Sequence, residues 1–245
     1  MIIRLLSAAL AAGFFAAAVV TGLELTLTSP LIVAAERYEQ QDSPHQAARA
    51  LPIVLAHAGH DHAAPDAAPA WQPGPGLPRM AFTGLATLVG GVGYALLLGA
   101  VMLACGREPT PQVGLAFAVA GFASVALAPG LGLPPELPGS AAAPLAARQA
   151  WWVMTAAATG MGLYLITIRR ALITILGGLV LIIAPHVVGA PQAPEAASEL
   201  PAVLAAQFAA RSLAISFVFW ILIGLGFGWA WQAFARGMEP GAARA

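Results

Sequence analysis

Three of the chain's five histidines lie within six residues, at His57, His60 and His62, with Asp61 among them. Imidazole nitrogens are frequent ligands of divalent transition metals, and a carboxylate adds a harder oxygen donor. Gly59 lets the backbone bend so that the three rings can converge. The segment offers no rigid frame for four fixed ligands, so it predicts a weak, exchangeable site for Co, Ni, Zn or Cu. The alternative interpretation is a solvated polar loop whose histidines bind nothing.

Two further candidate ligands lie on stiffer segments. Glu136 stands between prolines in the string Leu-Pro-Pro-Glu-Leu-Pro-Gly, where the backbone cannot continue a helix. Its carboxylate suits a metal ligand or a salt bridge to Arg148, and the alternative is a rigid turn with an exposed acid. His186 follows Pro185 near the end of an apolar run. An ionisable group within a membrane segment is a functional hypothesis by default, and the alternative is a hydrogen bond to a neighbouring helix.

Two glutamates complete the set of candidate metal ligands. Glu24 lies near the outer end of the first apolar run, where it either faces a cavity or reaches water at the membrane interface. Glu36 belongs to a short amphipathic helix predicted over residues 31–41, after a break at Pro30. We expect Glu24 or Glu36 to contribute to the site that Glu136 and His186 form.

The composition indicates what kind of protein carries these ligands. Of its 245 residues, 59% are hydrophobic and only 9% are charged, whereas soluble domains carry about 25% charged residues. The chain is therefore predicted to be a membrane protein. Its formal net charge of zero argues against a nucleic-acid partner. The single Cys105 excludes an internal disulfide and a cysteine-based zinc site, and the sequence contains no common enzyme motif, so no enzymatic activity is expected.

Six apolar runs predict an all-α, polytopic integral membrane protein with a single membrane domain. A helix needs about 20 apolar residues to cross about 30 Å of hydrocarbon. The predicted spans are residues 4–27, 80–104, 113–131, 151–168, 172–188 and 208–234. The first is interpreted as an uncleaved span and not as a signal peptide. The polar, proline-rich segment 42–78 is predicted to be an extended outer loop that carries the histidines.

The arginines give an orientation. With the N-terminus inside, six arginines lie on inner segments and five on outer segments. The adjacent Arg169 and Arg170 in a very short turn favour the inner side, because positive residues in short loops stay in the cytoplasm. Both termini are then cytoplasmic, and the histidine-rich loop lies outside a bacterial inner membrane. Most acidic residues also fall on the outer side, where they attract cations.

Several strings along the chain are specific enough to compare with a known family. They are Thr28–Ile32, Ala35–Glu39, the histidine-rich loop, Arg79–Thr83, Leu131–Gly139, Arg148–Trp152 and Pro185–Gln192. Together they resemble the CbtA family of probable cobalt transporter subunits over nearly the whole chain. The resemblance implies a small single-span partner with a histidine-rich end, CbtB, and a role in supplying cobalt for cobalamin synthesis. It also implies five spans where the residues indicate six.

The residues and the resemblance together predict the transmembrane subunit of a divalent transition-metal importer. Co²⁺ is the expected ion, and no permanent cofactor is expected. The histidine-rich loop would collect the ion, and the glutamates and His186 at the outer membrane face would select it. The alternatives are Ni²⁺ as the ion, or a non-transporting metal-binding membrane protein such as an assembly factor or sensor. Membrane lipid and further copies of the chain are the other expected partners.

Overall fold

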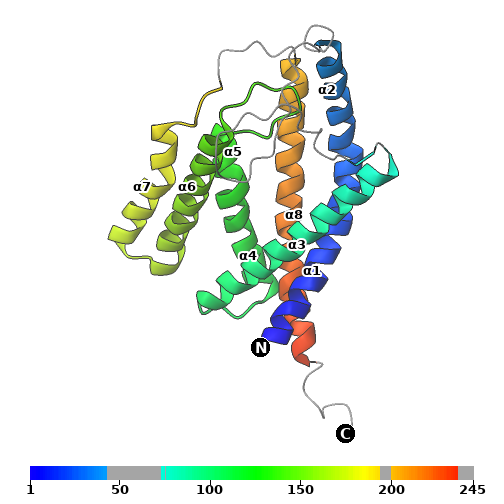
Figure 1. The fold of residues 1–245 in the computed structure, drawn as a ribbon. Coiled ribbons are helices and arrows are strands. Elements are labelled where there is room, and N and C mark those ends of the chain that lie inside the picture. The colour runs from blue at the N-terminus through cyan, green and yellow to red at the C-terminus, as the bar shows by residue number, and fades with distance from the viewer. Residues whose placement is uncertain (43–72, 75, 194–199, 237–245) are drawn as a thin grey trace, which may run out of the picture.

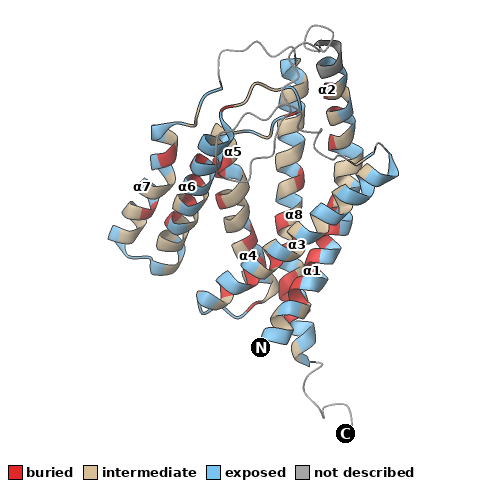
Figure 2. Cartoon of the chain, in the orientation of Figure 1, coloured by how far each residue is buried: buried red, intermediate tan, exposed pale blue. Residues whose placement is uncertain are grey.

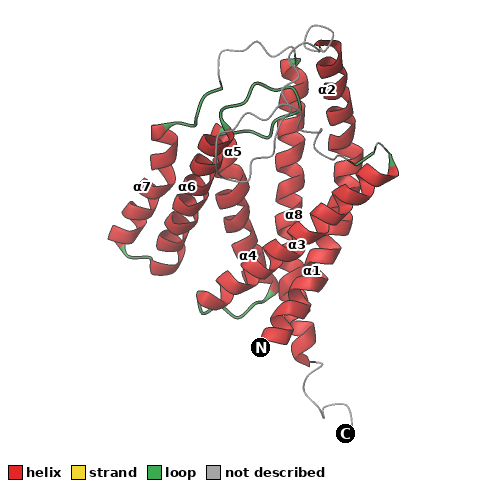
Figure 3. Cartoon of the chain, in the orientation of Figure 1, coloured by secondary structure: helices red, strands yellow, loops and turns green. Residues whose placement is uncertain are grey.

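The described part of the chain folds into helices (Figures 1 and 3). The computed structural model describes residues 1–42, 73–74, 76–193 and 200–236, and no strand occurs among them. In chain order the elements are α1 (Ile2–Leu23), η1 (Glu24–Thr28), α2 (Ser29–Asp42), α3 (Leu77–Ala104), α4 (Pro111–Phe122), η3 (Ala123–Leu127), α5 (Ala128–Gly132), α6 (Leu145–Tyr164), η4 (Leu165–Arg169), α7 (Leu172–Val188) and α8 (Ala202–Arg236), where η marks a π-helical turn. The all-α prediction is confirmed.

Five helices in the described ranges are long and apolar enough to span a membrane. They cover Ile2–Tyr38, Leu77–Ala104, Pro111–Gly132, Leu145–Arg169 and Ala202–Arg236. Apolar side chains on their outer faces are open to the surroundings, as Phe14 and Val89 show with 65% exposure each. Such surfaces belong in lipid, since a water-soluble protein rarely exposes large apolar patches.

Five described helices reach the length of a span, and the sixth predicted span corresponds to a shorter apolar helix. The predicted span 172–188 is present as α7 with the same bounds. Its 17 residues, however, extend only about 26 Å at 1.5 Å per residue, which is less than the ~30 Å of hydrocarbon. α7 still runs back along α6, so the start of α1 and the end of α8 lie at the same end of the molecule (Figure 1).

The main core lies between α1, α3, α4 and α8, with Phe227, Met102 and Ile223 as its largest fully buried apolar side chains. The helix backbones touch at glycines, and a Cβ on Gly114 would collide with the Gly224 carbonyl oxygen. Small residues of this kind let membrane helices associate, because burying apolar side chains gains little over contact with lipid. Figure 2 shows the buried positions as stripes along α1 and α8.

A polar contact group joins the two ends of the chain. Arg4 Nε donates to the Trp231 carbonyl oxygen at 2.7 Å, and its guanidinium lies 4.0 Å from the centre of the Trp231 ring. Trp231 Nε1 donates to Glu108 Oε1 at 2.7 Å, and Arg4 forms an ion pair with the same carboxylate at 3.6 Å. These bonds connect the start of α1, the α3–α4 turn and the end of α8.

The predicted break at Pro30 is wrong, because α1, η1 and α2 form one continuous helix over Ile2–Asp42. The π turn just before the proline explains the difference. At its end the Ser29 N–H donates to the Glu24 carbonyl oxygen, a bond that spans five residues instead of four. The change of register falls where Pro30 lacks an N–H, and Thr28 Oγ1 adds a bond to the Glu24 carbonyl at 2.9 Å. The helix predicted over 31–41 is therefore an extension of the first span.

The α6–α7 pair forms a helical hairpin beside the main core. Its helices touch where a Cβ on Gly178 would lie 2.6 Å from the Gly162 carbonyl oxygen. The turn between them is very short, and Arg170 adopts a left-handed backbone conformation with φ 55°. Glycine usually occupies that conformation, so an arginine at this position adds strain to the backbone.

Replacement of Gly178 by valine is expected to separate α6 from α7, because the new side chain meets the Gly162 backbone. Gly177→Val is the matched control, since nothing lies within 4 Å of a Cβ at that position. Overpacking costs about 1–3 kcal/mol, so Gly178→Val should lower the unfolding temperature of the purified protein in detergent well below that of the control. Equal unfolding temperatures for the two variants would contradict this packing.

Candidate functional site

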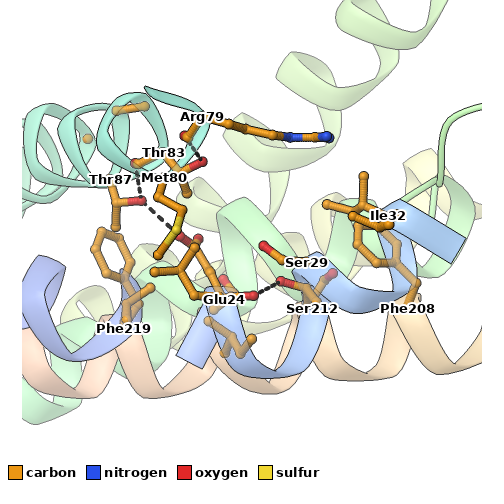
Figure 4. A pocket seen from close by; sticks show the side chains of 18 of the residues that line it. Glu24, Ser29, Ile32, Arg79, Met80, Thr83, Thr87, Phe208, Ser212 and Phe219 are labelled. Carbon is orange, nitrogen blue, oxygen red and sulfur yellow. Dashed lines mark hydrogen bonds between the residues drawn. The ribbon is translucent and has the colours of Figure 1, made fainter. Parts of the chain in front are cut away.

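A pocket of about 960 Å³ with several polar side chains lies between the first helix, α3 and α8 (Figure 4). The helix segments that line it lie away from the two termini (Figure 1). Glu24, Glu36 and Arg79 are its charged residues. Six residues supply hydroxyl groups, namely Thr28, Ser29, Thr83, Thr87, Ser212 and Ser216. The remaining wall is mostly apolar and includes Phe208 and Phe219. The pocket thus collects oxygen donors inside helices that are otherwise built for lipid.

Glu24 is the central charged group of this pocket. It begins the π turn η1, and such turns often occur at functional sites because they widen the helix and turn a side chain outward. Its side chain is half-buried, and no basic residue in the described ranges forms an ion pair with it. A carboxylate in a membrane helix without a basic partner is costly, which makes Glu24 a candidate ligand for a cation.

Thr87 can adapt to such a cation. Its Oγ1 lies 2.9 Å from Glu24 Oε2 and 2.9 Å from the Thr83 carbonyl oxygen (Figure 4). A hydroxyl has one hydrogen and can donate it to only one of these acceptors at a time. When a cation takes Glu24 Oε2, the hydroxyl can donate to Thr83 instead. The carboxylate therefore exchanges partners without leaving a buried donor unsatisfied.

Glu36 has a different environment although it lines the same pocket. Arg79 Nη2 and Nη1 donate to its two carboxylate oxygens at 2.5 and 3.2 Å, which connects α2 to α3. Two-point pairing of this kind holds both side chains in one geometry. With Glu36 neutralised by Arg79, Glu24 is left as the free carboxylate of the pocket.

Glu136 lies on the loop between α5 and α6, beside the wall of the pocket. Arg148 Nη1 donates to Glu136 Oε2 at 2.5 Å, so the predicted salt bridge is confirmed. The next residue, Leu137, is buried against α2 and α8, in a cluster that includes Ile32 and Phe208. Both of these residues also line the pocket. The loop that carries Glu136, residues 133–144 and here called the glutamate loop, is thus packed on the outer surface of the pocket wall.

His186 lies at the far end of α7, next to α6. Its ring meets the Trp151 ring edge to face at a centroid distance of 6.1 Å. Because Arg148 and Trp151 are one helical turn apart on α6, Glu136 and His186 occupy the same corner of the molecule. Neither residue lines the pocket that contains Glu24. The structure therefore separates the four glutamate and histidine candidates into two groups.

The ligands predicted in the histidine-rich loop lie outside the described residues. They are His57, His60, Asp61 and His62. Within the described ranges, no three residues of the types His, Cys, Asp and Glu come together as a metal-binding group. A cation in the pocket would be held by one carboxylate, by hydroxyl oxygens and by water. That ligand set suits passage of a partly hydrated ion better than permanent binding.

Sequence reasoning missed the hydroxyl groups of the pocket. Thr83 and Thr87 on α3, and Ser212 and Ser216 on α8, are each four residues apart. This spacing places both members of a pair on one helix face, which is a visible signal in an apolar run. The assignment of these two faces to one pocket with Glu24 required the tertiary structure.

Comparison with known proteins gives one result. The family model described as "Probable cobalt transporter subunit (CbtA)" matches residues 2–232. No curated protein and no solved structure matches the chain. The family match extends over all the helices that form the pocket, the glutamate loop and the α6–α7 hairpin. The chain, an all-helical protein with several helices of membrane-spanning length, therefore belongs to the CbtA family of probable cobalt transporter subunits.

Proposed function

We propose that this subunit carries Co²⁺ into the cell and that Glu24 is the carboxylate the ion meets within the membrane. The observation that carries the proposal is the half-buried Glu24 in a pocket with six hydroxyl-bearing residues and no basic partner for it among the described residues. Co²⁺ accepts carboxylate oxygen and water together, so partial dehydration suffices for binding. Imported cobalt would be available for cobalamin synthesis.

The route begins outside the membrane. His57, His60 and His62, with Asp61, collect the ion by reversible ligation. Glu136 and His186, at the same end as the pocket mouth, then form the entrance at the outer face. The ion passes from there to Glu24, while Glu36 and Arg79 hold α2 against α3 at the rim.

The orientation places the pocket in the outer half of a bacterial inner membrane and both termini in the cytoplasm. The charges of the described residues support it, because the end with the termini carries Arg4, Arg107, Arg169, Arg170 and Arg236 against the single acid Glu108. Short loops rich in arginine stay inside. The membrane potential, negative inside, then favours entry of a cation by about 2.3 kcal/mol per charge per 100 mV.

The family description includes the word subunit, which calls for a partner. We propose a small single-span protein with a histidine-rich end, of the CbtB type. Ni²⁺ is the alternative ion, since imidazole, carboxylate and hydroxyl groups do not separate it from Co²⁺. A membrane protein that binds the metal without moving it is the alternative function. Co²⁺ flux into sealed vesicles that contain the chain and its partner separates transport from binding.

Replacing Glu24 by glutamine is expected to lower Co²⁺ uptake into such vesicles about 10-fold or more, because the pocket loses the carboxylate that is not paired with Arg79. Thr87→Val, which removes the adaptable hydroxyl, should lower it by a smaller factor. Thr26→Val is the matched control: Thr26 lies in the same π turn, bonds only to carbonyls of its own helix and does not line the pocket. Unchanged uptake by Glu24→Gln would show that the ion takes another route.

Collection and selection are expected to differ in their kinetics. Replacement of His57, His60 and His62 by alanine together should raise the external Co²⁺ concentration needed for half-maximal uptake and leave the maximal rate unchanged. His186→Ala or Glu136→Gln should lower the maximal rate itself. Both effects are measured from initial rates over a range of Co²⁺ concentrations. Loss of uptake to the same extent in all variants would contradict the division of roles.

The orientation is tested with a reporter that is active only in the cytoplasm. Fused after Arg170, in the α6–α7 turn, such a reporter should be active. A second fusion within residues 42–78 should be inactive, because that loop is placed outside. The opposite pattern would reverse the direction of entry proposed above.

A further inference from the structure

A second groove lies on the other side of the main core, between α3, α4 with η3, and α6 with η4. Its volume is about 600 Å³, and most of its wall is apolar, including Leu98, Phe117, Leu163 and Trp220. It contains no carboxylate among its lining residues. The groove therefore differs from the Glu24 pocket in both position and chemistry.

One end of the groove is polar and positively charged. Arg107, from the α3–α4 turn, and Arg170, from the α6–α7 turn, line it together with Gln112 and Thr167. Neither arginine forms an ion pair with a carboxylate of the described residues. The neighbouring Glu108 is engaged by Arg4 and Trp231. Two exposed guanidinium groups thus stand at the mouth of an apolar groove without a carboxylate partner among the described residues, and Arg170 Nε donates to the Thr167 carbonyl oxygen at 2.7 Å.

The backbone conformation of Arg170 is a separate indication that its side chain has a role at the groove. It is the one residue other than glycine with a positive φ among the described residues. Glycine would occupy this backbone conformation without strain. An arginine in its place keeps a positive group beside the groove at a backbone cost.

The length of the groove indicates what it can hold. Along α4 and η3 its lining extends from Gln112 to Val125, which corresponds to about 20 Å at 1.5 Å per residue. One leaflet of the hydrocarbon core is about 15 Å thick, half of the ~30 Å total. A partner helix packed along its whole span would need a groove of about 30 Å. A groove with one charged end, longer than one leaflet and shorter than the whole hydrocarbon core, fits a lipid.

We propose that this groove binds an anionic phospholipid, with the phosphate group at Arg107 and Arg170 and an acyl chain along the apolar wall. Basic pockets between membrane helices are a recognised means of binding anionic headgroups. The two arginines come from opposite walls, one next to the main core and one from the α6–α7 hairpin. The lipid therefore fastens the hairpin to the core. This inference does not depend on which ion the protein carries.

Binding is tested by native mass spectrometry of the full-length protein after removal of lipid and addition of phosphatidylglycerol or phosphatidylcholine. The wild type should retain phosphatidylglycerol in preference. Arg107→Gln with Arg170→Gln should weaken its binding about 30-fold, the effect expected from two charges near an anionic headgroup. Arg169→Gln is the matched control, since Arg169 adjoins Arg170 but does not line the groove. An equal loss in the control, or no preference in the wild type, would overturn the proposal.

The acyl chain is tested separately. Cys105 is the only cysteine of the chain and lines the groove, so a photoreactive group attached there in native membranes reports what occupies it. Crosslinks to phospholipid are expected. Crosslinks to another protein instead would show that the groove is a docking site for a partner helix. Ala116→Phe, which fills the groove without changing charge, should abolish the lipid crosslink, and retention of the crosslink would also contradict the proposal.

Discussion

Contact between helix backbones at glycines is the constraint on which the architecture depends. At Gly13 a Cβ would lie 2.6 Å from the Val92 backbone nitrogen, and the Gly114–Gly224 and Gly162–Gly178 contacts are similarly close. In lipid no hydrophobic force pulls helices together, so such contacts and polar bonds supply most of the association. They hold α1 against α3 and α4 against α8, and α1, α3 and α8 form walls of the Glu24 pocket. The pocket lies between the same helices, beyond these close backbone contacts.

Two of the helices contain a π turn just before a proline, a feature that sequence rules do not predict. In the first helix the π turn Glu24–Thr28 precedes Ser29 and Pro30, and in the third spanning helix the π turn Ala123–Leu127 precedes Ala128 and Pro129. In both, the residue before the proline donates its N–H across five residues. Proline normally interrupts a helix because it lacks this donor. A register change just ahead of it lets the helix continue, which is why the predicted end at Pro30 was wrong.

The helices themselves were largely predictable from the sequence, and the arrangement of the site was not. Apolar length and flanking turns located α7 with its observed bounds, and the proline-held Glu136 pointed to its partner Arg148. The surroundings of Glu24 could not be predicted, since they come from α3 and α8. Thr87, for example, is 63 residues away in the sequence. The separation of Glu136 and His186 from the pocket likewise follows from the packing of α6 beside the core. The local sequence pattern of a helix does not determine which faces of different helices pack together.

The contact group at the chain ends has a consequence for biosynthesis. Arg4 bonds to Trp231, 227 residues later, so the first helix enters the membrane long before its partner on α8 has been made. Ser212 and Ser216, which complete the pocket wall, also belong to this last helix. A chain that stops before α8 lacks both the serines of the pocket wall and the Trp231 contact of Arg4. The Glu24 pocket is therefore completed only after α8 has been made.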